Sequence, residues 1–156
     1  MNPKNILIVG TNNTTRTYMA EAVIRRLCEE RELDEVEISS RGLVVLFPEP
    51  VNPRAAQAVG DAGYKIREFQ ATKLSGADVE KADLILTITL EEKEHVLADY
   101  EEELADSDKV FTISEAAKEP VGIPNPYGKE VEDYATCFVT VRRMCEKCFD
   151  NKILKK

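Results

Sequence analysis

The residues best suited to chemistry in this chain form one short polar loop, Gly10-Thr11-Asn12-Asn13-Thr14-Thr15-Arg16-Thr17. The loop follows an aliphatic run and precedes a helical pattern, so main-chain N–H groups from a tight turn and a helix N-terminus can point at one spot. Arg16 adds a planar guanidinium that can hold two oxygens of a phosphate. Asn12 and Asn13 suit the left-handed backbone that such loops often need. Residues 11–16 are therefore predicted to bind a phosphate-like oxyanion.

Three interpretations of this loop are open when its eight residues are taken alone. As a nucleotide phosphate loop, G-x4-G-K-[ST], it has two departures, because Thr15 replaces the second Gly and Arg16 replaces the Lys. As the C-x5-R-[ST] loop of cysteine phosphatases it lacks the Cys, whose place is taken by Gly10. As an ordinary polar turn between a strand and a helix, it leaves Arg16 in solvent.

Four short aliphatic runs alternate with helical patterns, and these elements must position the loop. Buried strands are predicted at 6–9, 36–40, 84–88 and 110–113. The first helix is predicted from Tyr18 to about Glu30, with Thr17 as its N-cap and Glu21 in its first turn. Further helices are predicted from Asn52-Pro53 to Gly63, over the acidic stretch 91–104, and over 129–150. The tail 152–156 is expected to fray.

This alternation predicts an α/β fold over a single domain, residues 1–156, with a four-stranded parallel sheet between two layers of helices. Ligands in such folds lie beyond the carboxyl ends of the strands. Two loops can occupy that edge, the polar loop 10–17 and the proline-rich loop 119–128.

Composition excludes several classes of function. The chain has 156 residues, 29 acidic and 21 basic, and its net charge of −8 argues against a general nucleic-acid binder. No apolar run approaches the ~20 residues that a membrane helix needs, and the N-terminal run is too short for a signal peptide. A cytoplasmic location is expected.

The four cysteines do not resemble a disulfide framework, because three of them crowd one end: Cys28, Cys137, Cys145 and Cys148. The C-x2-C spacing of Cys145 and Cys148 is interpreted as packing rather than metal binding, since no second pair exists. Neither a metal nor an organic cofactor is implied. His95 and the acidic run 91–108 are expected on a solvated surface.

Five segments carry a resemblance that covers nearly the whole chain. They are residues 6–22 (ILIVGTNNTTRTYMAEA), Ser40-Arg41-Gly42, Asn52-Pro53-Arg54-Ala55 with Gly63-Tyr64, residues 82–87 (ADLILT) and residues 123–128 (IPNPYG). In the same order they resemble the C-T-G-N-T-C-R-S-P-M-A-E-A opening, the S-A-G segment, the next helix, the A-D-L-I-L-T strand and the I-P-D-P-[FY]-G loop of the low-molecular-weight protein tyrosine phosphatases. The resemblance implies the phosphotyrosine phosphatase I-like fold.

The resemblance also implies where catalytic groups belong, and those positions are substituted. In the family the first loop Cys attacks phosphorus, and the Asp of D-P-[FY]-G protonates the leaving oxygen and then activates water; here Gly10 and Asn125 stand in their places. An amide has no acidic proton that it could transfer to a leaving oxygen near neutral pH. Loss of the nucleophile costs about 10⁶ in turnover in a serine protease, and a general acid contributes about 10²–10⁴. A catalytically inactive pseudo-phosphatase is therefore expected.

Binding is expected to survive where catalysis does not. Asn13, Arg16 and Thr17 stand where the family has Asn, Arg and Ser; Ser40 stands where a Ser braces the loop, and Tyr127 where an aromatic flanks the substrate. Loss of the thiolate also removes a repulsion, which for two unit charges about 4 Å apart reaches about 4 kcal/mol at an effective dielectric of 20. The expected partner is phosphate or a phosphorylated protein.

The identity of the ligand has one further clue. Thr14 stands where the arginine phosphatases of the family have Thr, which makes phosphoarginine a candidate beside phosphotyrosine. Thr15 replaces the second loop Cys, so the redox couple of the family is absent.

Two alternatives to an inactive pseudo-phosphatase remain open. One is a weakly active phosphatase, and the other is an interaction module with a vestigial pocket.

Overall fold

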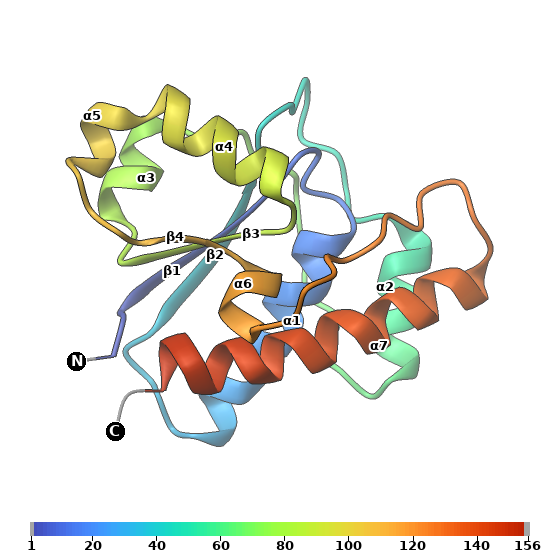
Figure 1. Cartoon of the computed structure of the whole chain (residues 1–156). Helices are drawn as coiled ribbons and strands as arrows, with labels where there is room; N and C mark the ends of the chain where they lie inside the picture. Colours follow the sequence, from blue (N-terminus) through green and yellow to red (C-terminus); the bar gives the residue numbers. More distant parts are fainter. Residues whose placement is uncertain (1, 155–156) are drawn as a thin grey trace.

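The computed structural model describes residues 2–154, and within them four parallel strands form a sheet in the order β2-β1-β3-β4 (Figure 1). The strands are β1 (Asn5–Gly10), β2 (Glu37–Gly42), β3 (Leu84–Thr87) and β4 (Val110–Thr112). Strand β1 lies between β2 and β3, and its side chains are buried in a core on each face of the sheet, which explains its unbroken aliphatic run. The four predicted strands are confirmed, with β2 shifted toward Gly42.

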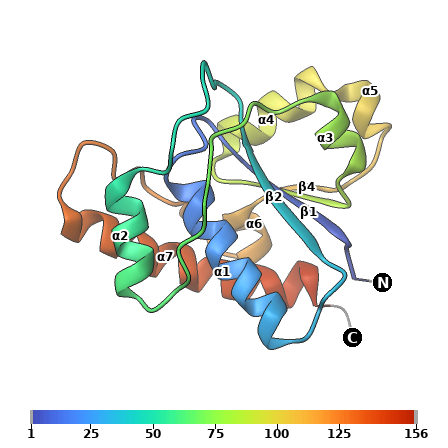
Figure 2. The same ribbon diagram turned by 180° about the vertical axis from the view of Figure 1, so that it is seen from behind.

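Helices cover both faces of the sheet, as Figures 1 and 2 show from opposite sides. One layer holds α1 (Arg16–Glu30), α2 (Pro53–Asp61), α6 (Ile113–Ala117) and α7 (Val131–Cys148), and the other holds α3 (Gly76–Lys81), α4 (Leu90–Asp99) and α5 (Glu101–Leu104). Successive side chains of β1 enter different cores, because side chains alternate along a strand: Ile6 and Ile8 pack in the first layer, Leu7 and Val9 in the second. The predicted three-layer α/β architecture is confirmed.

Helix α1 begins earlier than the sequence suggests. Thr15 holds the N-cap position and Thr17 lies in the first turn, so the prediction of Thr17 as N-cap is wrong. The reason is that the Thr17 hydroxyl is engaged by the side chain of Asn13. Glu21 lies beyond the first turn, where it pairs with Arg25, so its predicted role at the helix start is also wrong.

Two short helices, α3 and α6, were not predicted, because five or six residues show no clear helical period. Each begins with a reciprocal capping box, formed by Ser75 with Asp78 and by Thr112 with Glu115. The predicted acidic helix divides at Tyr100 into α4 and α5.

The C-terminal segment is ordered further than expected. Helix α7 continues into a π-helical turn, η1 (Phe149–Ile153), and Ile153 is fully buried in the core. The prediction that the tail frays is therefore wrong for residues 152–154, because burial of an apolar side chain holds the chain end; residues 155–156 lie outside the described residues. No helix within residues 2–154 has the length and apolar character needed to cross a membrane.

Candidate functional site

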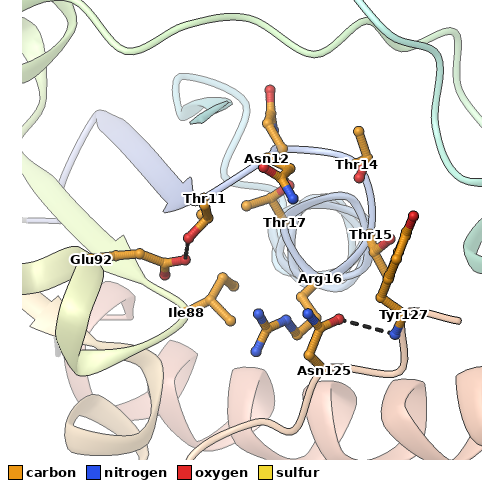
Figure 3. Close-up of a pocket in the computed structure, with 12 residues that line it drawn as sticks. Thr11, Asn12, Thr14, Thr15, Arg16, Thr17, Ile88, Glu92, Asn125 and Tyr127 are labelled. Atoms are coloured by element: carbon orange, nitrogen blue, oxygen red, sulfur yellow. Dashed lines mark hydrogen bonds between the residues drawn. The ribbon is translucent and has the colours of Figure 1, made fainter. Parts of the chain in front are cut away.

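A cavity of about 240 Å³ opens at the carboxyl ends of β1 and β3 (Figure 3). Loop 10–17 forms most of its wall, Ile88 and Glu92 line it from the β3 side, and Asn125 and Tyr127 come from the proline-rich loop. The two loops predicted at this edge therefore meet around one cavity.

The main chain of the polar loop has unused donors. Within residues 2–154, the N–H groups of residues 12–15 donate no hydrogen bond to a protein atom. Helix α1 starts directly afterwards at Arg16, and the first N–H groups of a helix lack intrahelical acceptors. Unpaired N–H groups and a helix N-terminus together create a positive potential suited to an anion.

Asn13 holds the loop in its shape from inside. Its φ of 59° is the left-handed conformation predicted from its residue type, whereas Asn12 has no positive φ. The buried side chain donates from Nδ2 to Thr17 Oγ1 at 2.9 Å and to Ser40 Oγ at 3.0 Å. Its Oδ1 accepts from the main-chain N–H of Thr72 at 2.9 Å. The loop is thereby tied to α1, β2 and the segment between α2 and α3.

Arg16 is half-buried and reaches the proline-rich loop, where its Nη1 donates to the carbonyl of Ile123 at 2.7 Å. This bond uses one of the five guanidinium N–H donors. Burial lowers the pKa of Arg16, and the nearby carboxyl of Glu92 acts in the opposite direction. The interpretation of the loop as a turn with a solvated Arg16 is therefore wrong.

Glu92 was missed by the sequence analysis, which assigned the run 91–108 to a solvated surface; Glu92 is only 1% exposed. It is the third residue of α4, and its Oε1 accepts from the N–H of Thr89 at 2.8 Å in a capping box. Its Oε2 accepts from the hydroxyl of Thr11 at 2.8 Å (Figure 3). A signal was present: the T-x-x-E spacing of Thr89 and Glu92 directly follows a buried strand, and such strands end at the ligand edge.

Gly10 lies where no side chain fits. A Cβ on Gly10 would lie 2.6 Å from Thr17 Cγ2, 3.7 Å from Ile88 Cγ1 and 3.9 Å from Glu92 Oε2. The first of these distances is a clash with a buried methyl group.

Asn125 and Tyr127 form the outer rim of the cavity. The Oδ1 of Asn125 accepts from the main-chain N–H of Tyr127 at 3.1 Å, which is a turn stabilised by its own side chain (Figure 3). Tyr127 is 76% exposed, so its ring is accessible to a ligand outside the cavity.

Comparison with known proteins identifies the scaffold. The sequence profile of the family described as low molecular weight phosphotyrosine protein phosphatase matches residues 5–156. The chain belongs to this family. A probable low molecular weight protein-tyrosine-phosphatase, EpsP of Ralstonia nicotianae, is 29% identical over 140 residues, which cover 90% of each chain. The protein-arginine-phosphatase of Bacillus subtilis is 28% identical over 131 residues, 83% of this chain and 84% of the relative. The crystal structure of a low molecular weight protein tyrosine phosphatase from T. tengcongensis superimposes with a TM-score of 0.85 at 26% identity, over 94% of this chain and 97% of that one.

This member of the low molecular weight phosphatase family has no thiol in the cavity. Gly10 stands at the start of the R-[ST] loop and Asn125 in the I-P-N-P-Y-G segment, and both line the cavity. Thr15, in the same loop, lines the cavity and is buried. None of the four cysteines lines this cavity.

The cysteines of this phosphatase family member are all buried outside the cavity, and Cys137 lies near Arg16, where its Sγ donates to the carbonyl of Pro124 at 3.6 Å. Burial raises the pKa of the Cys28 and Cys137 thiols to about 11 and that of Cys148 to about 12, and it raises the pKa of Cys145 as well. Thiols held in the protonated form are poor nucleophiles. Within residues 2–154, no three His, Cys, Asp or Glu side chains gather as metal ligands. His95 is exposed, as predicted, and lies 2.6 Å from Asp99.

Proposed function

We propose that this chain is a catalytically inactive member of the low molecular weight phosphatase family whose polar loop binds the phosphate group of a phosphorylated protein. One observation carries the proposal: the unpaired N–H groups of residues 12–15 and the half-buried Arg16 share a cavity with Gly10, which offers no nucleophile.

The loss of catalysis follows from the residue types at two positions, Gly10 and Asn125. Without a sulfur at Gly10, no phosphocysteine can form, and the amide of Asn125 cannot protonate a leaving oxygen. The buried cysteines do not replace the nucleophile, since none of them lines the cavity. The absence of the nucleophile alone is expected to cost about 10⁶ in turnover.

Binding is supported by the geometry that remains. Asn13 fixes the loop through three hydrogen bonds, so little conformational entropy has to be lost when an anion enters. Arg16 is held at the cavity by Ile123, and its remaining donors suit a planar two-oxygen contact. Asn125 can donate from its Nδ2 at the rim, where an Asp would have presented a negative charge.

The phosphorylated residue is expected to be phosphoarginine or phosphotyrosine. One relative is named a probable protein-tyrosine-phosphatase and another a protein-arginine-phosphatase. Thr14, in the position where the resemblance places the Thr of the arginine phosphatases, adds phosphoarginine to the candidates.

The binding proposal is tested by titrating ¹⁵N-labelled protein with inorganic phosphate. The amide signals of residues 11–16 should shift at millimolar phosphate, and the substitution Arg16→Lys should weaken binding by about tenfold or more, because the ammonium cannot make the two-oxygen contact. Arg26→Lys, on the same helix but outside the cavity, is the matched control. Loop amides that stay in place throughout the titration would refute the proposal.

Inactivity is tested separately with para-nitrophenyl phosphate, for which no turnover above the uncatalysed rate is expected. Turnover that is abolished by Arg16→Ala and unaffected by thiol reagents would instead favour a weakly active phosphatase. Partner capture that is unchanged by Arg16→Ala would favour an interaction module with a vestigial pocket.

A further inference from the structure

Glu92 places a negative group inside a cavity that otherwise suits an anion. The side chain is 1% exposed and lines the same cavity as loop 10–17. Its Oε2 lies 3.9 Å from the position that a Cβ on Gly10 would occupy. Figure 3 shows the carboxyl group reaching Thr11 from the side opposite to the proline-rich loop. Substitution of the nucleophile has therefore not left this part of the cavity free of negative charge.

The carboxyl group is positioned firmly but retains capacity to accept hydrogen bonds. Each oxygen accepts one hydrogen bond from the protein, Oε1 from the N–H of Thr89 and Oε2 from the hydroxyl of Thr11. A carboxylate has about four acceptor sites, so roughly two remain. An ionised Glu92 carboxylate with free acceptor sites lies beside the loop N–H groups that would bind the anion. It is compatible with a bound anion only when that anion presents a proton to it.

Tetrahedral anions differ in whether they carry such a proton. Sulfate carries none at neutral pH, whereas hydrogen phosphate does, and a phosphate monoester carries one below its second pKa of about 6. An unprotonated oxygen facing Glu92 would place two negative groups together in a partly dehydrated cavity, and a P–OH group would instead donate a charge-assisted hydrogen bond.

We propose that Glu92 makes this site prefer a phosphate group that retains a proton, either hydrogen phosphate or a singly protonated phosphate ester, over sulfate. This inference rests on the proposed binding of phosphate by the polar loop. The N–H groups of residues 12–15 and Arg16 hold the unprotonated oxygens, and Glu92 accepts from the P–OH group.

The proposal has a direct consequence for pH dependence. Besides Glu92, the charged or titratable side chains among the described residues that line the cavity are Arg16 and Tyr127. With Arg16 and the N–H groups alone, a doubly charged ester would bind more tightly than a singly charged one. With Glu92 present, affinity for phenyl phosphate should fall as pH rises through 6, while affinity for inorganic phosphate, which keeps a proton, should fall far less.

The test is titration calorimetry with inorganic phosphate, sulfate and phenyl phosphate between pH 5.5 and 8. The variants are Glu92→Gln, whose amide oxygen can still accept from Thr89, and Glu91→Gln, an exposed neighbour, as matched control. The wild type should prefer phosphate to sulfate by about tenfold or more, the range expected for one charge-assisted hydrogen bond. Glu92→Gln should bind both anions about equally and should prefer the doubly charged ester. Glu91→Gln should behave as the wild type.

The other outcomes are distinguishable. Equal affinity of the wild type for phosphate and sulfate overturns the role of Glu92 and leaves the phosphate-binding function intact. Binding of both anions by Glu92→Gln and of neither by the wild type shows that Glu92 only repels anions, which overturns the inference and also the proposed binding of phosphate by the natural chain. Absence of binding in the wild type and in Glu92→Gln refutes the phosphate-binding function itself.

Discussion

The methyl group of Thr17 occupies the space that a side chain at position 10 would need, because Cγ2 lies 2.6 Å from the Cβ position of Gly10. Thr17 cannot simply turn away, since its hydroxyl accepts from Asn13 Nδ2 at 2.9 Å and it is almost fully buried. Gly10 and Thr17 therefore form a matched pair in the wall of the cavity.

Gly10→Ala should lower the free energy of unfolding by about 1–3 kcal/mol, the usual cost of inserting a methyl group into a packed interior. The backbone is not the cause, because the φ of Gly10 is not positive. In the double variant Gly10→Ala with Thr17→Ser the clash disappears and most of the loss should be recovered. Urea denaturation of the four proteins in a double-mutant cycle measures the coupling, and simple additivity of the two substitutions would contradict the packing described here.

Asn13 carries the second prediction. Asn13→Ala removes three hydrogen bonds and places Ala at a φ of 59°, a left-handed conformation that Asn tolerates better. The free energy of unfolding should therefore fall by about 2–4 kcal/mol. Asn12→Ala is the control, because Asn12 is exposed and lacks a positive φ. Thermal unfolding monitored by circular dichroism compares the two, and equal melting temperatures would show that Asn13 does not hold the loop.

Glu119, at the start of the proline-rich loop, gives a prediction about pH. Its carboxylate accepts from Arg143 at 2.8 Å and 3.1 Å and pairs with Lys147 at 3.1 Å, and these contacts lower its pKa to about 2. A carboxyl whose pKa is lowered by folding stabilises the fold above its ordinary pKa and loses that contribution as pH falls toward the folded value.

Glu119→Gln should therefore lower the stability by about 0.5–1 kcal/mol at pH 7, since Arg143 and Lys147 are half-exposed. The difference from the wild type should shrink between about pH 4.5 and 2. Glu132→Gln, an exposed acid on α7, is the control. A difference that does not change with pH would mean that the ion pairs with α7 are not its source.

The cysteines give a prediction about reactivity. With thiol pKa values of about 11 to 12 for Cys28, Cys137 and Cys148, only about a thousandth or less of each thiol is ionised at pH 8. A disulfide reagent should therefore modify the native protein slowly, at a rate that follows unfolding, and modify all four thiols rapidly in denaturant. Rapid modification of one thiol in the native protein would reveal an accessible thiolate.

The raised pKa values of the buried thiols also affect the stability of the protein at alkaline pH. A group whose pKa is raised by folding stabilises the fold below its ordinary pKa, here about 9, and this contribution is lost as pH rises toward 11 or 12. The unfolding free energy should decline above about pH 9, and replacement of Cys28 by Ala should reduce the steepness of that decline.

Local sequence was sufficient for the elements that are long or strongly patterned. The aliphatic run of β1, the start of α2 at Asn52 with Pro53, and the long helical pattern of α7 are each determined by near neighbours, so these three elements were predicted correctly. Shorter helices such as α6 lack a readable period, and the end of the chain was assigned as frayed because the partners of Ile153 are distant in sequence.

The sequence by itself determined the α/β fold, the meeting of the two loops at one edge of the sheet, and the absence of a thiol and a carboxyl at positions 10 and 125. Only the tertiary structure decided that Glu92 enters the cavity, that Arg16 is held by Ile123, and that Thr17 fills the space beside Gly10. The physical reason is separation along the chain: Glu92 and Thr11 lie 81 residues apart, and Arg16 and Ile123 lie 107 apart. Such contacts depend on how the packed layers meet, which residue types and short-range spacing do not specify.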